Sequence, residues 1–392
     1  MSEKLRLGVI GVGNMGTAHV QNIMKGREPE IELTAVADID PARLEAVKEI
    51  APQARCYDTA EALIRSGDAD AVVIATPHYF HPPLAIEALN AGLHVMSEKP
   101  AGVYTKQVRE LIDVAEKSDK TYAIMFNQRT NSVYRKVREL VQSGDYGEMR
   151  RVSWIITDWF RTQSYYNSGA WRATWAGEGG GVMLNQCPHQ LDLWQWICGM
   201  PVKVRAVCKE GLWHDIEVED DVTIFAEYPN GATGTFITTT GDCPGDNRLE
   251  ITLDRAKIVC EYNQRAKEFE IWMYELNMGT AEYIKNCDKG FKKLEGRWVK
   301  VSHDGKNEQH VGVMNAFAAH ILHGAPLVAE GKEGINGLAI SNAAFLSSWL
   351  EKEIALPPDE DLYYELLQEK IKNSRYKKTV RTQVETDMGS TF

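Results

Sequence analysis

Three features that would mark other classes of protein are missing from this sequence. No stretch reaches the roughly 18 consecutive apolar residues of a membrane-spanning helix, and residues 1–6 do not lead into a signal peptide. Positive charge is in deficit, because 44 Lys and Arg face 55 Asp and Glu, for a net charge of −11. Neither a nucleic acid nor an anionic membrane is expected as a partner, since each would need a basic face. We therefore expect a cytoplasmic protein that binds a small molecule.

Cysteine is scarce and irregularly placed. The seven cysteines are odd in number, scattered along the chain and never spaced as a CxxC pair. This pattern favours reduced thiols over a disulfide framework and gives no sign of zinc, so no metal is expected. At 392 residues the chain exceeds the ~250–300 residues at which a single core stops growing, which predicts two domains.

The most informative motif that is present is Gly11-Val12-Gly13-Asn14-Met15-Gly16. It follows the apolar run 7–10 and opens a predicted helix, and Asp38 ends the next apolar run about 20 residues downstream. The three glycines permit a sharp turn, close approach of backbone to a pyrophosphate, and tight packing of helix on strand. The phosphates would lie at the helix N-terminus, and Asp38 would accept both hydroxyls of an adenosine ribose. The motif predicts a dinucleotide site.

Asp38 also bears on the choice between the two nicotinamide cofactors. Its carboxylate would repel the 2′-phosphate of NADP. The next residues, Ile39 and Asp40, offer no arginine that could hold this phosphate. The sequence therefore predicts NAD as the cofactor.

The first third of the chain alternates apolar strand-like runs with helix-like segments, which is typical of a parallel α/β sheet. Asp40-Pro41 predicts a capped helix start, and Thr105 is a second candidate N-cap. The strand-like runs are 5–10, 33–37, 71–75, 94–96 and 122–126.

From about residue 149 strands follow strands, which predicts an α+β domain with a large, mostly antiparallel, open-faced sheet covered by helices on one side. We expect an NAD-binding Rossmann domain in residues 1–126 and a substrate-binding and oligomerisation domain in residues 127–374. A polar tail follows in residues 375–392. An uncovered sheet face predicts a homo-oligomer, either a dimer or a tetramer. The expected strands are 151–157, 202–208, 222–227, 232–239, 249–253 and 269–274, with helices at 315–323 and 337–352.

Lys99 lies in Ser97-Glu98-Lys99-Pro100, just after the fifth predicted strand. It would project from the carboxyl edge of the sheet, where ligands bind in open α/β folds. Its ammonium could hydrogen-bond a substrate hydroxyl and ease deprotonation during oxidation. A surface lysine in a turn is the alternative.

A second candidate for chemistry is the segment 179–192, which begins with three glycines. Pro188 suits the first turn of a helix that Gly199 ends, so His189 would lie at the positive end of the helix dipole and stay a neutral base. Asp192, three residues on, shares the helix face and is expected to orient the imidazole. A capping or core histidine is an equally good interpretation.

Aromatic residues concentrate in residues 158–178, which hold six of them where about two are expected from the average content of 9%. Such rings beside hydrogen-bond donors suit the C–H faces and hydroxyls of a sugar. A subunit interface is nearly as good an explanation. The aromatic and arginine residues are Trp159, Phe160, Arg161, Tyr165, Tyr166, Trp171, Arg172 and Trp175.

Taken together, these motifs resemble the glucose–fructose oxidoreductase / inositol dehydrogenase / rhizopine catabolism family, Gfo/Idh/MocA, from about Lys4 to Ser374. The motifs that carry the resemblance follow the family's order. They are the glycine loop with Asp38, Ala75-Thr76-Pro77 with His81, Glu98-Lys99-Pro100, Asn127-Gln128-Arg129, and the triple glycine leading to His189 and Asp192.

The resemblance implies that Lys99 and His189 are the catalytic pair, with His189 taking the hydroxyl proton. Many members carry Asp where this chain has Asn185, and an amide cannot relay a proton, so Asn185 is expected to position a substrate hydroxyl. Arg161, Tyr165, Trp171 and Arg172 are the other substrate-binding candidates. The implied NAD-binding residues are Gly11, Gly13, Asn14, Met15, Gly16, Asp38, Thr76, His81, Glu98, Lys99 and Asn127.

The segment Asn185-Gln186-Cys187-Pro188-His189 resembles the branch of the family that acts on pyranose sugars and glycosides, as do Leu356-Pro357-Pro358-Asp359 and Tyr363-Tyr364. The implied activity is NAD-dependent oxidation of a secondary hydroxyl of such a substrate. An NAD-dependent glycoside hydrolase that oxidises its sugar transiently would need the same residues. An inositol or polyol dehydrogenase and a nucleotide-sensing protein on the same fold are further alternatives.

Overall fold

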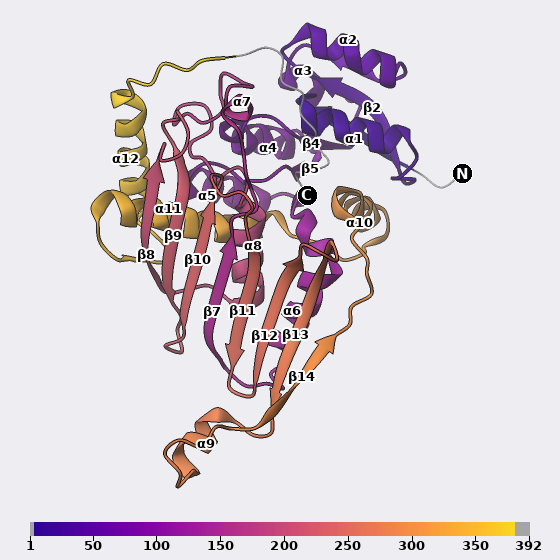
Figure 1. Cartoon of the computed structure of the whole chain (residues 1–392). Coiled ribbons are helices and arrows are strands. Elements are labelled where there is room, and N and C mark those ends of the chain that lie inside the picture. Colours follow the sequence, from indigo (N-terminus) through magenta and orange to yellow (C-terminus); the bar gives the residue numbers. More distant parts are fainter. Residues whose placement is uncertain (1–3, 381–392) are drawn as a thin grey trace.

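The computed structural model describes residues 4–380 (Figure 1). Its first domain is built on a parallel sheet with the order β3-β2-β1-β4-β5-β6, the doubly wound arrangement that the alternating pattern predicted. Helices α1 (Asn14–Met24), α2 (Pro41–Ile50), α3 (Ala60–Ile64), α4 (His81–Asn90) and α5 (Thr105–Ala115) connect the strands. The strands are β1 (Leu5–Ile10), β2 (Ile31–Ala37), β3 (Arg55–Tyr57), β4 (Ala71–Ile74), β5 (His94–Ser97) and β6 (Tyr122–Ile124).

The order of connection reverses between β1 and β4, and the carboxyl ends of these strands lie side by side. A side chain on Gly11 would come within 2.8 Å of the Ala75 carbonyl oxygen, so the loops after β1 and β4 are in close contact. This switch point is where open α/β sheets bind ligands.

The two predicted helix caps have different outcomes. Asp40 caps α2 as expected, because its side chain accepts from the Ala42 amide. Thr105 is not an N-cap: α5 begins at Thr105 itself, and the Thr105 amide donates to Asn342 Oδ1 at 3.0 Å. Thr105 is buried, and α11 (Gly334–Leu350) supplies the missing acceptor from more than 200 residues away.

The second domain carries a nine-stranded sheet in the order β14-β13-β12-β11-β7-β10-β9-β8-β15. All its neighbours are antiparallel except β7 and β10, so the predicted sheet type is confirmed. The strands are β7 (Met149–Ile156), β8 (Lys203–Glu210), β9 (Glu219–Glu227), β10 (Thr233–Thr239), β11 (Asn247–Leu253), β12 (Ala256–Asn263), β13 (Glu268–Leu276), β14 (Gly296–Val301) and β15 (Ile354–Ala355).

Helices cover one face of this sheet and leave the other face open, as Figure 1 shows. Side chains alternate accordingly: Ile224 is fully buried, whereas the adjacent Phe225 is 41% exposed. Val207 and Trp298 are also exposed on their strands. The covering helices are α5, α6 (Ser132–Gln142), α8 (Pro188–Cys198), α11 and α12 (Glu360–Asn373).

One helix from late in the chain returns to the first domain. α10 (Gln309–His323) packs Val313 and Phe317 into the same core as Leu7 and Val9 of β1. The apolar spacing of this helix predicts a buried face but does not tell which of the two cores receives it. The two domains are therefore tied together by more than the connection near residue 127.

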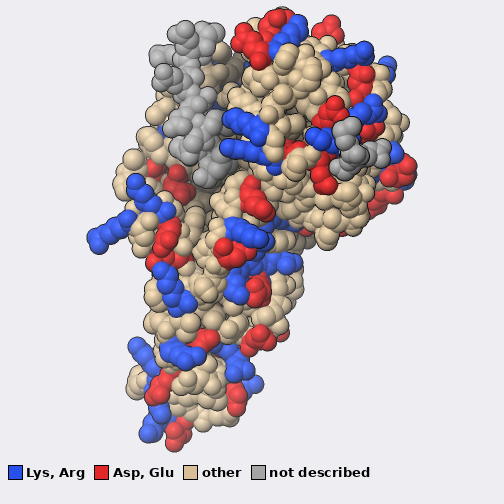
Figure 2. Space-filling view, turned by 90° about the vertical axis from the view of Figure 1, so that its right-hand side faces the viewer, with Lys and Arg blue, Asp and Glu red and all other residues tan. Residues whose placement is uncertain are grey.

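A short arm leaves the far end of the sheet between β13 and β14 and carries α9 (Thr280–Asn286) (Figure 1). Figure 2 shows basic and acidic side chains interspersed over the face that it draws. Within residues 4–380 no helix combines the length and apolarity needed to cross a bilayer. All seven cysteines are free thiols, as predicted. Of the predicted tail, residues 381–392 lie outside the described part of the chain.

Candidate active site

The glycine loop has a geometry that fits a bound dinucleotide. A side chain at Gly16 would lie 1.8 Å from the Gly11 carbonyl oxygen, and Gly11 itself has a φ of +86°, so both positions require glycine for the turn and the packing. A side chain at Gly13 would meet only Arg43 Nη1, at an ordinary contact distance of 3.5 Å. α1 begins directly afterwards with Asn14 and Met15. The backbone here leaves room for a pyrophosphate at a helix N-terminus.

Asp38 lies at the end of β2, beside this loop. Its Oδ2 accepts from the Val12 amide at 2.8 Å and its Oδ1 accepts from the Asp40 amide at 2.9 Å. Arg43 Nη1 lies 3.6 Å from Asp38 Oδ2. Residues 39 and 40 offer no arginine, but the first turn of α2 brings Arg43 back beside Asp38. The prediction from the sequence did not include this arginine.

Two of the other cofactor candidates leave polar atoms free at the carboxyl edge of the sheet. Thr76 Oγ1 and Asn127 Oδ1 are buried without a hydrogen-bond partner among the described residues, as expected of groups that await a ligand. The two ring nitrogens of His81 lie 2.7 Å from the carbonyl oxygens of Pro100 and Thr76. His81 therefore links two loops of the site, and its contact with the cofactor stays a prediction.

Glu98 is buried beside His19 of α1, with 2.8 Å between Oε1 and Nε2. Burial opposes ionisation of this carboxyl, but the hydrogen bond and charge of His19 outweigh it and lower the pKa of Glu98 to about 2. An ionised carboxylate thus lies next to Lys99. His19, which lies one helical turn beyond the glycine loop, was not among the predicted residues.

Lys99 and His189 come together in one buried site. Lys99 Nζ donates to the Asn185 carbonyl oxygen at 2.9 Å, and burial lowers the pKa of Lys99 while the charge of Glu98 raises it. His189 is 5% exposed, and neither ring nitrogen has a hydrogen-bond partner among the described residues. Burial, and then the charge of Lys99, lower the pKa of His189 well below its usual range. The imidazole is therefore neutral and free to accept a proton.

Asp192 does not orient His189, so that expectation is wrong. Its two carboxylate oxygens accept from Arg129 Nε at 2.8 Å and Arg129 Nη2 at 2.7 Å, and both side chains are almost fully buried. Arg129 also reaches Glu333 at 2.7 Å. A shared helix face places Asp192 near His189, but a bidentate guanidinium from outside the helix satisfies the carboxylate instead.

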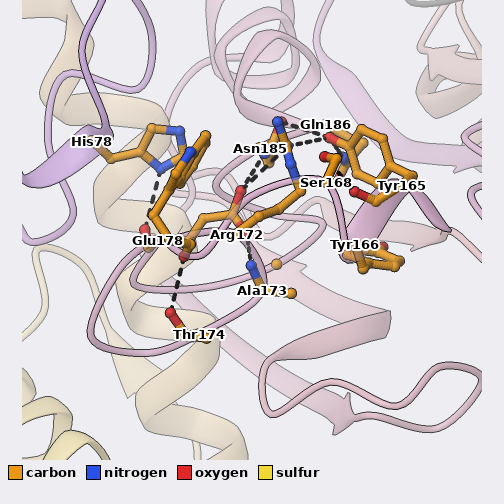
Figure 3. Close-up of polar contacts among 12 residues, drawn as sticks. His78, Tyr165, Tyr166, Ser168, Arg172, Ala173, Thr174, Glu178, Asn185 and Gln186 are labelled. Atoms are coloured by element: carbon orange, nitrogen blue, oxygen red, sulfur yellow. Dashed lines mark hydrogen bonds and ion pairs between the residues drawn. The ribbon is translucent and has the colours of Figure 1, made fainter. Parts of the chain in front are cut away.

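The predicted substrate residues form one cluster in front of this pair. Figure 3 shows Tyr165 between Arg172 and Gln186: Arg172 Nη1 donates to the Tyr165 hydroxyl at 2.5 Å and Gln186 Nε2 donates to it at 2.9 Å. The Arg172 guanidinium lies 4.4 Å from the centroid of the Tyr165 ring and 4.7 Å from that of Trp171. Arg161 is 5.2 Å from the Tyr165 ring. The cluster offers aromatic faces and cationic donors together.

Not all of the aromatic residues in segment 158–178 belong to this cluster. Trp175 and Tyr166 are almost fully buried, and Trp175 packs edge-on against Phe345 at 5.5 Å between ring centroids. These two side chains anchor the segment to the core of the second domain. Composition alone could not separate them from the exposed aromatic side chains beside them.

Glu178 was not among the predicted residues. It directly precedes the three glycines, is 1% exposed and lies within the cluster of Figure 3. Its carboxylate accepts from the Ala173 amide at 2.5 Å and from Asn185 Nδ2, and its carbonyl oxygen lies 3.2 Å from His78 Nδ1. Its place between Gly177 and Gly179 does not by itself indicate a role.

Comparison with known proteins adds three findings. A family model for an oxidoreductase family with an NAD-binding Rossmann fold matches residues 5–126, and the GFO/IDH/MocA C-terminal domain model matches residues 134–259. An inositol 2-dehydrogenase of Corynebacterium glutamicum is 29% identical over 235 residues, which are 59% of this chain and 66% of that protein. This match spans just under two thirds of the relative's length. An inositol 2-dehydrogenase of Rhizobium meliloti is 25% identical over 90% of this chain and 99% of its own.

Two solved structures are similar over nearly the whole chain. The WlbA dehydrogenase of Chromobacterium violaceum, in complex with NADH and UDP-GlcNAcA, is 27% identical with a TM-score of 0.76, over 92% of this chain and 98% of that one. Levoglucosan dehydrogenase, in complex with NADH and levoglucosan, has a TM-score of 0.74 over 91% of this chain and all of that one. At 20% identity the second likeness shows the fold alone.

Proposed function

Because this chain belongs to the GFO/IDH/MocA family of oxidoreductases and carries its NAD-binding Rossmann domain, we propose that it is an NAD-dependent dehydrogenase. Its substrate would be a cyclic sugar or polyol with a secondary hydroxyl. The observation that carries this proposal is the buried His189 imidazole, neutral and without a protein partner on either ring nitrogen, beside the Lys99 amine.

The roles of the two side chains follow from their surroundings. Lys99, held at the Asn185 carbonyl, would donate a hydrogen bond to the substrate oxygen and stabilise negative charge as it develops there. His189 would accept the hydroxyl proton, because burial keeps it neutral. Bound NAD would supply the hydride acceptor for the carbinol carbon. Thr76 and Asn127, each with a free buried oxygen, are the residues that would hold it together with the glycine loop and Asp38.

For the substrate, we favour a pyranose or its glycoside, with an inositol as the second candidate. The cluster of Tyr165, Trp171 and Arg172 presents ring faces and donors that suit the C–H groups and hydroxyls of either. The relatives named inositol 2-dehydrogenase support the second candidate. None of the proteins compared above is named as a glycoside hydrolase, so redox-neutral glycoside cleavage has no support.

The first experiment is an NADH absorbance assay with NAD and a panel of pyranoses, inositols, anhydrosugars and glycosides. NADH formation with one class, lost in His189→Ala, is the expected result. Formation that survives the substitution would contradict the role of His189. No NADH with any member of the panel, from protein that binds NADH, would contradict the proposed substrate class.

We also propose that the protein is a homo-oligomer. The open sheet face exposes Val207, Phe225 and Trp298, and apolar side chains on a broad sheet face are typical of a surface that a second subunit covers. Light scattering on purified protein measures the assembly directly, and a monomer at micromolar concentration would contradict this proposal.

A further inference from the structure

Glu178 is a buried carboxylate to which the mechanism above gives no role. It connects two parts of the substrate loop, because one oxygen accepts from the Ala173 backbone amide and the other from the side-chain amide of Asn185. Asn185 in turn supplies the carbonyl oxygen that holds Lys99. Only one residue therefore separates Glu178 from the catalytic lysine.

The hydrogen bonds around Asn185 run in one consistent direction. The Tyr165 hydroxyl receives hydrogen bonds from Arg172 and Gln186, so its own hydrogen is left to point at Asn185 Oδ1, 3.5 Å away. Asn185 Nδ2 donates to Glu178. If the amide were turned over, its oxygen would face the carboxylate and its NH₂ group would face the tyrosine hydrogen. The carboxylate thus decides which way the amide points.

This orientation leaves an acceptor directed at the substrate cluster. A carbonyl oxygen accepts two hydrogen bonds, and the 3.5 Å contact with Tyr165 uses one of them weakly. Asn185 Oδ1 can therefore take a hydrogen bond from a substrate hydroxyl, while the backbone carbonyl of the same residue holds Lys99. One residue would then position both the substrate and the lysine.

Charge gives Glu178 a second effect on the same site. Arg172 Nη1 lies 3.8 Å from the buried Glu178 Oε1, and the charges of both side chains act on Lys99. The charge of Arg172 lowers the pKa of Lys99, whereas the charges of Glu98 and Glu178 raise it. Loss of the Glu178 charge would leave the lysine and the arginine facing each other with less compensation.

We propose that Glu178 is a positioning residue of this active site, which fixes the Asn185 amide with its oxygen toward the substrate and keeps Lys99 in place. The proposal deepens the dehydrogenase function and rests on it. A structural anchor of the same loop offers a control: Glu217, from the segment between β8 and β9, accepts from the Trp175 amide at 3.0 Å.

The first test is a double-mutant cycle with Glu178→Gln, Asn185→Ala and their combination, measured with the best substrate of the panel. In Glu178→Gln the new amide must turn its NH₂ toward one of two donors, so we expect kcat/KM to fall by roughly 10–100-fold with the greater part of the loss in KM. NADH affinity, read by fluorescence, should stay within about twofold. The double variant should lose clearly less than the product of the two single losses, because both substitutions remove the same orientation of the amide.

Glu217→Gln should keep near-normal kcat/KM. Losses that simply multiply in the double variant would overturn the proposal, because Glu178 would then act independently of Asn185. Equal losses in Glu178→Gln and Glu217→Gln would overturn it too, since any loop anchor would then have the same effect.

A second readout needs no substrate and so separates this proposal from the proposed function. Acetic anhydride labelling of the Lys99 peptide, followed against pH by mass spectrometry, reports how readily that amine loses its proton. We expect the midpoint to move down by about one unit in Glu178→Gln and to stay in place in Glu217→Gln. Glu178→Asp keeps the charge and should restore most of the midpoint without restoring KM. An unmoved midpoint in Glu178→Gln would overturn the electrostatic part of the proposal even if no substrate had been found.

Discussion

The cofactor side and the substrate side of this site are built in different ways. On the cofactor side the glycine loop lies within six residues, and the bond from Val12 to Asp38 spans 26 residues. On the substrate side Lys99 bonds to Asn185 across 86 residues, and His78 meets Glu178 across 100. Short spacings make the first side recognisable as a motif, whereas the second exists only once both domains have folded.

One buried acid outside the site, Glu28, differs from the buried acids within it. Glu28, in the Rossmann domain, is 1% exposed, and both of its oxygens lack a partner among the described residues. Glu178 and Glu219, beside the substrate loop, each accept two hydrogen bonds, and those of Glu219 come from the Gly181 and Met183 amides. These two acids hold backbone in place, whereas burial of Glu28 destabilises the folded state without a compensating hydrogen bond.

His189→Ala should impair catalysis on the substrate side and leave cofactor binding unchanged. Loss of the proton acceptor should lower kcat by about 10²–10⁴-fold, while NADH binding stays intact because the glycine loop and Asp38 are untouched. Stopped-flow or steady-state NADH formation measures the first effect and NADH fluorescence the second. His303→Ala, at an exposed histidine, serves as the control. A variant that lost NADH binding as well would show that the two sides are not separable.

Asp192→Ala removes the buried ion pair between Arg129 and Asp192 and should lower the stability of the protein. This substitution leaves Arg129 buried without its bidentate partner, and unpairing a buried ion pair costs about 3–5 kcal/mol of unfolding free energy. The exposed pair Arg135–Asp304, at 3.3 Å, offers the matched control, where Asp304→Ala should cost under about 1 kcal/mol. Urea unfolding measures both. Equal costs would show that burial of the first pair adds nothing.

The unpartnered Glu28 of the Rossmann domain predicts a pH dependence of stability. Burial raises the pKa of Glu28 to about 7, so the folded state holds this proton more tightly than the unfolded state. The contribution of protonated Glu28 to the free energy of unfolding is fully present below about pH 4.5 and is lost as the pH rises through 7. This contribution totals about 3 kcal/mol. In Glu28→Gln that decline disappears, so the variant should gain about 2–3 kcal/mol relative to wild type between pH 5 and pH 9.

Urea unfolding at the two pH values tests this prediction. Glu32→Gln, at an exposed position of the same domain, should show no such change. A constant difference between wild type and Glu28→Gln would mean that Glu28 is already ionised in the folded protein at pH 5.

Much of the fold could be predicted because it follows from periodicity. The alternation of runs up to residue 126 indicated the parallel sheet, and strand after strand from residue 149 indicated the antiparallel one. The strands β3, β12, β14 and β15 were missed. β3 and β15 are very short and β14 lies at the edge of the sheet, and such strands carry little apolar patterning. β12 is a central strand, which only two residues separate from β11. The core that receives α10 was also beyond the sequence, since an apolar face does not name its partner.

The residues of the site also fall into those that local spacing predicted and those that it did not. Glycine spacing predicted the glycine loop with Asp38, and the strand end predicted Lys99 at the edge of the sheet. The resemblance alone implied Thr76, His81, Glu98 and Asn127 as cofactor residues. Spacing along a helix suggested Asp192 as the partner of His189, but Arg129 occupies that carboxylate. Glu178 carries no local signal of its role, because its partner Asn185 lies across a loop whose path the sequence does not specify.

The cofactor side can be altered in its choice of ligand rather than broken. Asp38→Ser keeps an acceptor for the Val12 amide and removes the charge that would repel a 2′-phosphate. Arg43, whose Nη1 lies 3.6 Å from Asp38 Oδ2 in the wild-type protein, is retained. An arginine freed from its carboxylate is a good phosphate ligand, so the preference should move toward NADP by roughly 10–100-fold. NADH and NADPH titrations followed by fluorescence measure the ratio without any substrate. Glu45→Gln removes a charge of the same helix, α2, that pairs with Lys48 and should leave the ratio unchanged. An unmoved ratio in Asp38→Ser would place the adenosine ribose away from Asp38, and the short spacing of the motif would then not locate the ligand after all.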